Sequence, residues 1–154
     1  MSGVEPTAQI SLVAPYFQTP NKARQRELDE CLARNAENPL IDRIILVIDD
    51  GAQLPLQSDK IEVRHLESRP TYADWLSITE AMQLKGPTLL ANSDVYFDDS
   101  LALVHEVLSE PCVFMALSRW EVEGGRVSKH PNPHWSQDVW AIRAGSSDLS
   151  QLRE

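Results

Sequence analysis

Cysteine and positive charge are scarce in this chain, and each shortage excludes a class of protein. Cys31 and Cys112 are the only two cysteines among 154 residues, and they form no CxxC pair. A disulfide scaffold is therefore excluded, and we expect a reduced, cytoplasmic setting. Fourteen Lys and Arg stand against 23 Asp and Glu, which gives a net charge of −9. Because such a surface repels phosphate backbones, we expect no nucleic-acid partner.

Long apolar runs are also missing. No run approaches the roughly 20 residues that cross a bilayer, so we expect no transmembrane segment. The first residues, MSGVEPTAQ, lack the basic and then apolar pattern of a secretory signal. The 42% hydrophobic and 24% charged residues are typical of a folded domain. We expect one domain over 1–154, with its core over 8–143 and a polar tail over 144–154 that is free to fray.

Short apolar runs do occur, and they alternate with stretches in which apolar residues recur at helical spacing. These residues, which we expect to face the core, are Leu28, Cys31, Leu32, Tyr72, Trp75, Leu76, Met82, Leu101, Val104 and Leu108. The expected helices cover 22–35, a segment from Arg69-Pro70-Thr71 to Gly86-Pro87, and a segment that Asp98 or Asp99 caps. A hairpin is expected around Gly124-Gly125. The expected strands cover 9–14, 43–48, 60–66, 88–91, 112–117 and 138–143. This order predicts an α/β fold, a three-layer α/β/α sandwich with a mostly parallel sheet.

Polar residues follow the ends of the expected strands, which is the edge where parallel sheets bind ligands. Carboxylates that meet at such an edge repel one another unless a cation lies among them. The residues in question are Pro15, Tyr16 and Phe17 after the first strand, Asp49 and Asp50 after the second, Glu67 and Arg69 after the third, and Asn92, Asp94 and Asp98 after the fourth.

Two of these clusters each have two interpretations. Asn92-Ser93-Asp94 places oxygen ligands at i and i+2, which suits Mg²⁺ or Mn²⁺ with diphosphate oxygens. The same residues are also common in turns before a helix. Asp49-Asp50-Gly51 either closes its strand with a turn or presents an acid to a ribose or base. Their shared position at strand ends favours the functional interpretation of both.

The motifs SLVAPYF, IILVIDDG and LLANSDVYFDD, in this order, resemble the first half of a GT-A nucleotide-sugar glycosyltransferase. In that family the first strand often ends in Pro-Tyr, the second in Asp-Asp-Gly, and the fourth carries a D-x-D motif. The resemblance covers about residues 9–143. It implies that Pro15-Tyr16 and Asp49 or Asp50 contact the nucleotide. It also implies that Asp94, helped by Asn92, holds Mn²⁺ or Mg²⁺ bound to the donor diphosphate.

The C-terminal third adds further candidates. Asp138 is a candidate general base for an acceptor hydroxyl, or simply an acid that opens a strand. Arg69 and Arg119 either neutralise phosphate or form surface salt bridges. His130 and His134 are candidates for the metal or diphosphate, or ordinary loop histidines. The candidates for an apolar platform under a sugar or base are Trp120, Trp135 and Trp140, although core packing suits Trp140 better.

The sequence thus predicts a hexosyltransferase-type glycosyltransferase that moves a sugar from a nucleotide-diphosphate donor to a glycan or other hydroxyl acceptor. One alternative is a non-catalytic module that binds a nucleotide sugar or a glycan, or one part of a larger multidomain glycosyltransferase. A second is a nucleotidyltransferase. That class usually carries a glycine-rich basic segment after the first strand, whereas PYFQTPNKARQR over 15–26 contains no glycine.

Overall fold

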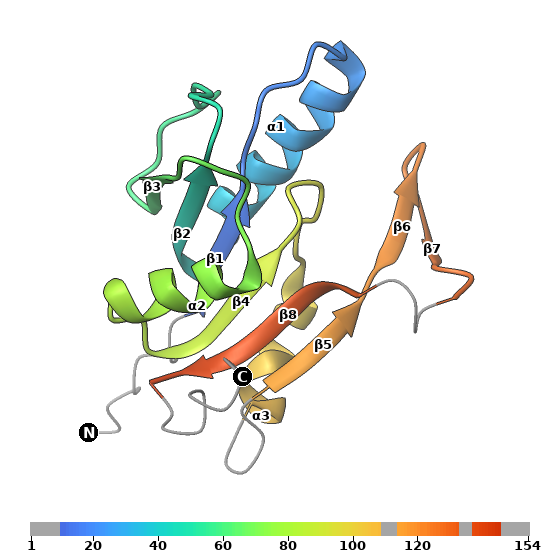
Figure 1. Cartoon of the computed structure of the whole chain (residues 1–154). Helices are drawn as coiled ribbons and strands as arrows, with labels where there is room; N and C mark the ends of the chain where they lie inside the picture. The colour runs from blue at the N-terminus through green and yellow to red at the C-terminus, as the bar shows by residue number, and fades with distance from the viewer. Residues whose placement is uncertain (1–9, 109–113, 133–136, 146–154) are drawn as a thin grey trace.

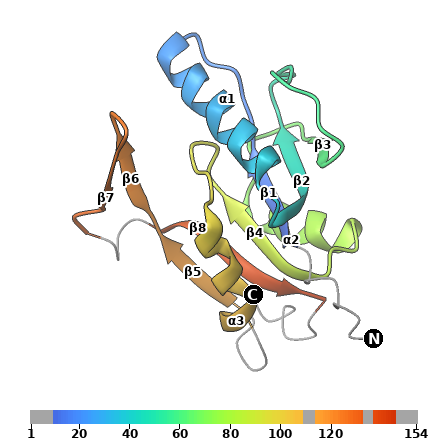
Figure 2. The same cartoon turned by 180° about the vertical axis from the view of Figure 1, so that it is seen from behind.

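A computed structural model describes residues 10–108, 114–132 and 137–145, and it shows a central sheet with helices on both faces (Figures 1 and 2). The strands are β1 Ile10–Pro15, β2 Ile41–Ile48, β3 Ile61–His65, β4 Gly86–Ala91, β5 Phe114–Ser118, β6 Trp120–Glu123, β7 Arg126–Lys129 and β8 Gln137–Ala144. The helices are α1 Lys22–Glu37, α2 Tyr72–Ala81, a 3₁₀ helix η1 over Asp99–Leu103, and α3 Val104–Val107.

The main sheet has six strands in the order β3-β2-β1-β4-β8-β5. Neighbours among β3, β2, β1 and β4 are parallel, whereas β8 runs antiparallel to both β4 and β5. The predicted three-layer sandwich with a mostly parallel sheet is therefore confirmed. Because β8 is reversed, its first residues lie at the edge where β1, β2 and β4 end.

Each face of the sheet has its own apolar core. On one face, Leu28 and Leu32 of α1 pack in the same cluster as Leu101, Val104 and Leu108. On the opposite face, α2 buries Trp75 and Leu76 (Figure 1). These buried positions match the predicted apolar stripes at helical spacing. Cys31 is also buried, as predicted, while Cys112 lies outside the described residues.

Side-chain caps explain where the two long helices begin. Asn21 accepts a hydrogen bond from the Arg24 amide at 3.1 Å, as the Thr19-Pro20-Asn21 sequence predicts. Thr71 and Asp74 form a reciprocal capping box at the start of α2. The loop after β2 turns at Gly51, whose φ of +72° suits a residue without a side chain.

Two details differ from the sequence predictions, and a third prediction is covered only in part by the described residues. The third helix is a 3₁₀ segment followed by a single α-helical turn, although its three apolar positions are buried as expected. Tyr72, predicted to face inward from α2, is 60% exposed. The residue opens the helix, so its ring lies at the margin of the core. The predicted strand over 112–117 is found as β5, and its first two predicted residues lie outside the described part of the chain.

The predicted Gly-Gly hairpin is the β6–β7 ribbon, which stands off from the end of β5 (Figures 1 and 2). Trp120 on this ribbon is 57% exposed. None of the described helices has the length and apolar character needed to cross a bilayer.

Candidate functional site

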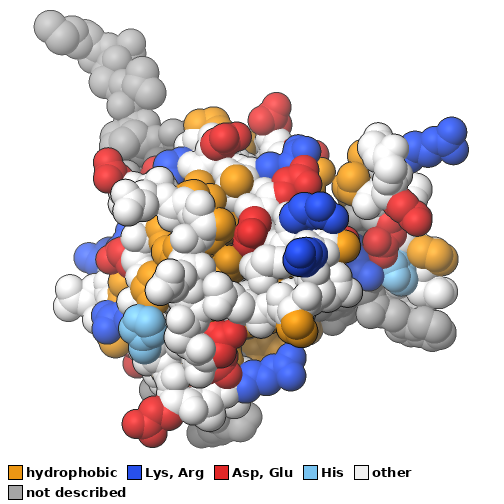
Figure 3. Space-filling model, turned by 90° about the horizontal axis from the view of Figure 1, so that it is seen from above, with side chains coloured by type: hydrophobic (Ala, Val, Ile, Leu, Met, Phe, Trp, Pro, Cys, Tyr) orange, Lys and Arg blue, Asp and Glu red, His pale blue; other side chains and the backbone are white. Residues whose placement is uncertain are grey.

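A cleft of about 690 Å³ opens where β1, β2 and β4 end and α2 begins. Figure 3 views this end of the molecule from above, with acidic and basic side chains interspersed among apolar ones. The lining includes eight residues that the sequence singled out as site candidates, which are Pro15, Tyr16, Phe17, Asp49, Arg69, Asn92, Asp138 and Trp140. These residues come from five separate segments of the chain. Asp50 and Asp94, also predicted, do not line the cleft.

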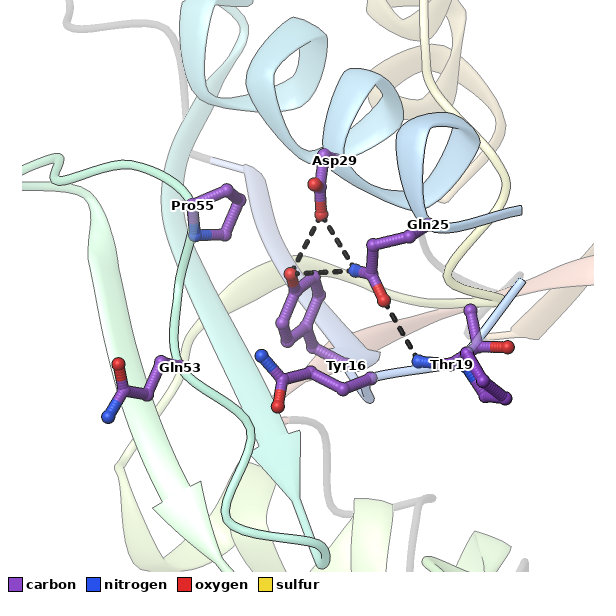
Figure 4. A pocket seen from close by; sticks show the side chains of 8 residues that line it. Tyr16, Thr19, Gln25, Asp29, Gln53 and Pro55 are labelled. Atoms are coloured by element: carbon purple, nitrogen blue, oxygen red, sulfur yellow. Dashed lines mark hydrogen bonds between the residues drawn. The ribbon is translucent and has the colours of Figure 1, made fainter. Parts of the chain in front are cut away.

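The Tyr16 hydroxyl is hydrogen-bonded on the side away from this cleft. The hydroxyl donates a hydrogen bond to Asp29 at 2.8 Å and accepts one from Gln25 at 3.1 Å. Burial, followed by the neighbouring Asp29 carboxylate, raises the pKa of Tyr16 above its ordinary value. Figure 4 shows this triad from α1 and the end of β1 in a second pocket of about 570 Å³. Tyr16 is 3% exposed, so it contributes part of the cleft wall without offering its hydroxyl.

Asp49 and Asp50 have different surroundings. The Asp50 carboxylate accepts hydrogen bonds from the amides of Gln18 at 3.0 Å and Ala52 at 2.9 Å. Asp50 therefore stabilises the turn after β2, as the structural interpretation predicted. Asp49 is exposed and lines the cleft. Of the two acids, Asp49 is the one that lines the cleft.

Asn92 and Asp138 meet because β8 is antiparallel to β4. The Asn92 amide nitrogen Nδ2 donates to Asp138 Oδ1 at 2.9 Å, and its backbone amide donates to the Asp138 carbonyl at 3.2 Å. The other carboxylate oxygen of Asp138 forms an ion pair with Arg119. Arg119 in turn donates to Glu121 of the β6–β7 ribbon at 3.0 Å. The orientation of the Asp138 carboxylate is thus fixed from both sides.

Asp94 is paired with a residue of α1. Its Oδ2 lies 3.1 Å from the Arg24 guanidinium, which also donates to Glu27 at 2.8 Å. The hydrogen bond to Glu27 and then the contacts with Asp94 raise the pKa of Arg24. Ser93 donates to the carbonyl of Pro15 at 2.7 Å, so the middle residue of the motif ties the ends of β4 and β1 together.

The chemistry of these donors fits one kind of metal site. Within 10–108, 114–132 and 137–145 there is no group of three or more His, Cys, Asp or Glu that could hold a metal ion. Mg²⁺ in phosphate-transferring sites is commonly bound by one or two carboxylates, with substrate phosphates and water as the other ligands. Asp94 and Asn92 carry oxygen donors of this kind, but Asp94 is paired with Arg24 and does not line the cleft.

The remaining predicted residues divide between the cleft and its surroundings. Arg69 is exposed at the cleft. His130 accepts a hydrogen bond from the Asn132 amide at 3.0 Å, and its Nε2 lies 3.7 Å from Glu121. It is therefore tied to its own loop and to the ribbon. His134 and Trp135 lie outside the described residues.

Two features of the site were not predicted. The indole N–H of Trp75, a residue that lines the cleft and is 5% exposed, has no hydrogen-bond acceptor among the described residues. The sequence shows only that Trp75 belongs to an apolar helical stripe. Arg24 was not expected at Asp94, because the two are 70 residues apart and no local pattern links them.

Comparison with known proteins gives structural likeness alone. No family model and no curated protein sequence matches the chain. The chain is similar in structure to the 2-C-methyl-D-erythritol 4-phosphate cytidylyltransferase of Francisella tularensis, with a TM-score of 0.58 and 18% identity over 89% of this chain and 73% of that one. A 4-diphosphocytidyl-2C-methyl-D-erythritol synthase has a TM-score of 0.50 and 14% identity over 89% of this chain and 76% of that one.

A glycosyltransferase is similar to about the same degree. Mannosyltransferase PcManGT from Pyrobaculum calidifontis, solved in complex with GDP-Man and Mn²⁺, has a TM-score of 0.56 and 13% identity. The match covers 94% of this chain but 46% of that one, so the chain spans less than half of the mannosyltransferase. At these identities the likeness establishes the fold: the chain has the α/β fold of the nucleotidyltransferases and GT-A-like transferases, with its cleft at the carboxyl ends of the parallel strands.

Proposed function

We propose that the cleft binds a nucleotide-diphosphate sugar and that the protein transfers the sugar to a hydroxyl acceptor. The observation that carries the proposal is the meeting of Asp49, Arg69, Asn92 and Asp138 with the Pro15-Tyr16 segment in one cleft. Asp49 offers a carboxylate to the donors of a ribose or base. Arg69 offers a guanidinium that can pair with a phosphate in bidentate fashion.

In this proposal Asp138 is the general base. Its carboxylate, oriented by Asn92 and Arg119, takes the proton of the acceptor hydroxyl as that oxygen bonds to the anomeric carbon. The bond from the anomeric carbon to the diphosphate breaks in the same step, and the nucleoside diphosphate leaves with the electron pair. Arg69 compensates part of the charge that develops on the leaving group.

A divalent cation, Mn²⁺ or Mg²⁺, is proposed to be held by Asp94 and Asn92. When bound, the ion supplies Lewis-acid stabilisation to the departing diphosphate. The chain itself contributes Arg24, whose pairing with Asp94 compensates the carboxylate when no ion is bound. Binding of the ion therefore requires this contact to open or to be shared.

Two other activities remain as alternatives. A nucleotidyltransferase has support from the cytidylyltransferase likeness, but the loop over 15–26 lacks glycine. A module that binds the donor without catalysis would use the same cleft. The two differ from the main proposal in their products, since a nucleotidyltransferase releases pyrophosphate and a binding module releases nothing.

Release of nucleoside diphosphate tests the main proposal. The protein is incubated with UDP- and GDP-hexoses and Mn²⁺, with and without added saccharides, and the nucleotide products are separated by chromatography. Asp138→Asn should lower the release rate by about 100-fold or more, in line with the usual contribution of a general base. Its donor affinity should stay within about twofold. Asp59→Asn, at an exposed acid away from the cleft, is the matched control and should leave the rate unchanged.

Several outcomes would contradict the proposal. Tight donor binding without release under any condition would favour the binding module. Pyrophosphate formed from a nucleoside triphosphate and a sugar phosphate would favour the nucleotidyltransferase. A release rate that is equal in Asp138→Asn and the wild-type protein would remove Asp138 as the base.

A further inference from the structure

On the face that carries α2, one part of the sheet has none of the described helices packed over it. In β8, Val139 and Ala141 pack into the core on the α1 side, whereas Trp140 and Ile142 belong to the α2 side. Ala116 of β5 pairs with Trp140. Figure 1 shows β8 and β5 in front with no helix over them, because α2 lies across the other strands.

Three aromatic rings lie together at this part of the sheet. Trp140 contacts Tyr72 edge to face, with centroids 5.9 Å apart, and stacks on Phe114 at 5.7 Å. Tyr72 is 60% exposed and Phe114 is 39% exposed. We name the surface formed by Tyr72, Phe114, Ala116 and Trp140 the aromatic shelf.

The aromatic shelf is continuous with the proposed active site. Trp140 and Tyr72 line the same cleft as Asn92 and Asp138. The shelf thus begins beside the carboxylate proposed as the base. The buried Trp75 indole N–H, which has no acceptor among the described residues, belongs to a third aromatic residue in the lining of this cleft. A water molecule or an acceptor on a bound ligand would satisfy such a donor.

The size and chemistry of the shelf match a sugar ring. Its two most exposed rings present about 200 Å² of aromatic surface, taking about 200 Å² for each ring. A stable protein interface needs about 800 Å² from each partner, so the shelf alone is too small to hold a second copy. A pyranose has an apolar C–H face that can lie on an aromatic ring and hydroxyls at its rim that need polar partners. Asn92 and Asp138 supply such partners at the border of the shelf.

We propose that the aromatic shelf is the acceptor subsite and that the acceptor is a pyranose-containing glycan. One sugar ring lies in the corner between Trp140 and Tyr72, whose planes meet at 87°, with a hydroxyl directed to Asp138. This inference rests on the proposed function, and it narrows the acceptor from any hydroxyl compound to a carbohydrate.

Nuclear magnetic resonance can test the subsite without turnover. The four tryptophans give four indole N–H signals, and Trp140→Phe identifies the one from the shelf. The ¹⁵N-labelled protein is titrated to 50 mM with methyl glycosides of glucose, mannose, galactose and N-acetylglucosamine, and with maltotriose and cellotriose. Sorbitol, which has hydroxyls but no ring, is the matched control ligand. Trp120, exposed on the β6–β7 ribbon, is the internal control.

We expect at least one cyclic sugar to shift the Trp140 signal in a saturable way, while sorbitol leaves it in place and Trp120 does not move. Tyr72→Ala should weaken this sugar at least fivefold and change the affinity for a nucleoside diphosphate less than twofold. Because Tyr72 packs edge to face on Trp140, Tyr72→Phe, which keeps that ring, is the matched control and should bind this sugar within twofold of the wild-type protein.

The opposing outcomes are distinct from failure of the proposed function. If nucleotides bind but no sugar moves Trp140, the acceptor subsite is wrong and donor binding stands. If nucleotides alone move Trp140, the shelf belongs to the donor site. A Trp140 signal that depends on protein concentration instead would assign the shelf to contact between copies. If neither nucleotides nor sugars bind, the proposed function itself fails.

Discussion

At the scale of single residues, the Tyr16 triad links the end of β1 to α1. The Tyr16 hydroxyl contacts Asp29 and Gln25, and all three side chains are partly shielded from solvent. Such a network holds the loop after β1 in place, and that loop contributes one wall of the cleft. The contribution of this hydrogen-bond network to stability can be measured separately from ligand binding.

Tyr16→Phe should lower the free energy of unfolding by about 1–2 kcal/mol, because Asp29 loses a hydrogen-bond donor. The pH dependence has a definite sign. The pKa of Tyr16 is raised on folding, so its stabilising effect is complete below about pH 10 and is lost as the pH rises further. Urea unfolding should show that the free energy of unfolding of the wild-type protein falls between pH 8 and pH 10.5. The fall should be smaller in Tyr16→Phe. Tyr72→Phe, at an exposed ring, is the control; an equal loss in Tyr16→Phe would contradict the assignment.

Cys31 offers a second test at this scale. Burial raises the pKa of the Cys31 thiol to about 11, with the Asp94 carboxylate as the next contributor. At pH 8 about one molecule in a thousand then carries the reactive thiolate. Iodoacetamide at pH 8 should leave Cys31 unmodified in the native protein and alkylate it in 6 M urea, as peptide mass mapping would show. Rapid alkylation of Cys31 in the native protein would contradict its buried position on α1.

At the scale of elements, α1 holds the loop that follows the Asn92-Ser93-Asp94 motif. The Asn35 side chain donates to the Val95 carbonyl at 2.9 Å and accepts from the Phe97 amide at 3.1 Å. Asn38, just beyond the helix, donates to the Phe97 carbonyl at 3.1 Å. Two asparagines at one end of a helix therefore satisfy backbone groups that β-pairing leaves free.

Asn35→Ala should destabilise the protein by about 1–3 kcal/mol, since it leaves buried backbone groups without partners. It should also weaken nucleotide binding, because the loop next to the cleft loses its attachment. Urea unfolding and calorimetric titration measure the two effects. Glu37→Ala, at an exposed position on the same helix, should change neither. A destabilised Asn35→Ala protein with unaltered affinity would show that the loop is not part of the binding site.

The elements also show how far the sequence can predict the site. Continuous apolar runs such as 43–48 identify buried strands, and helical spacing identifies the buried faces of α1 and α2. The direction of β8 is not encoded in its alternation of side chains, since either direction places Val139 and Ala141 on one face. That direction is what brings Asp138 to Asn92. The pairing of Arg24 with Asp94 likewise depends on tertiary packing, and no local pattern predicts it.

At the scale of the whole molecule, the net charge of −9 and the proposed anionic ligand are compatible only through local compensation. Arg24 and Arg119 are bound to carboxylates at the strand ends, and Arg69 is exposed at the cleft. A diphosphate that entered the cleft would therefore meet the Arg69 guanidinium as well as acids. Its affinity should fall with increasing salt, because exposed charge pairs are screened.

The central claim is that the cleft at the ends of β1, β2 and β4 binds a nucleoside diphosphate. A thermal-shift titration with UDP, GDP, CDP, ADP and their hexose conjugates, with and without Mn²⁺, tests it most directly. At 100 times the dissociation constant, binding should add about 2.7 kcal/mol to stability and raise the melting temperature by several degrees. Asp49→Asn should remove most of the rise, and Asp94→Ala its Mn²⁺-dependent part. No rise with any nucleotide under either condition, or a rise that Asp49→Asn leaves unchanged, would contradict the account.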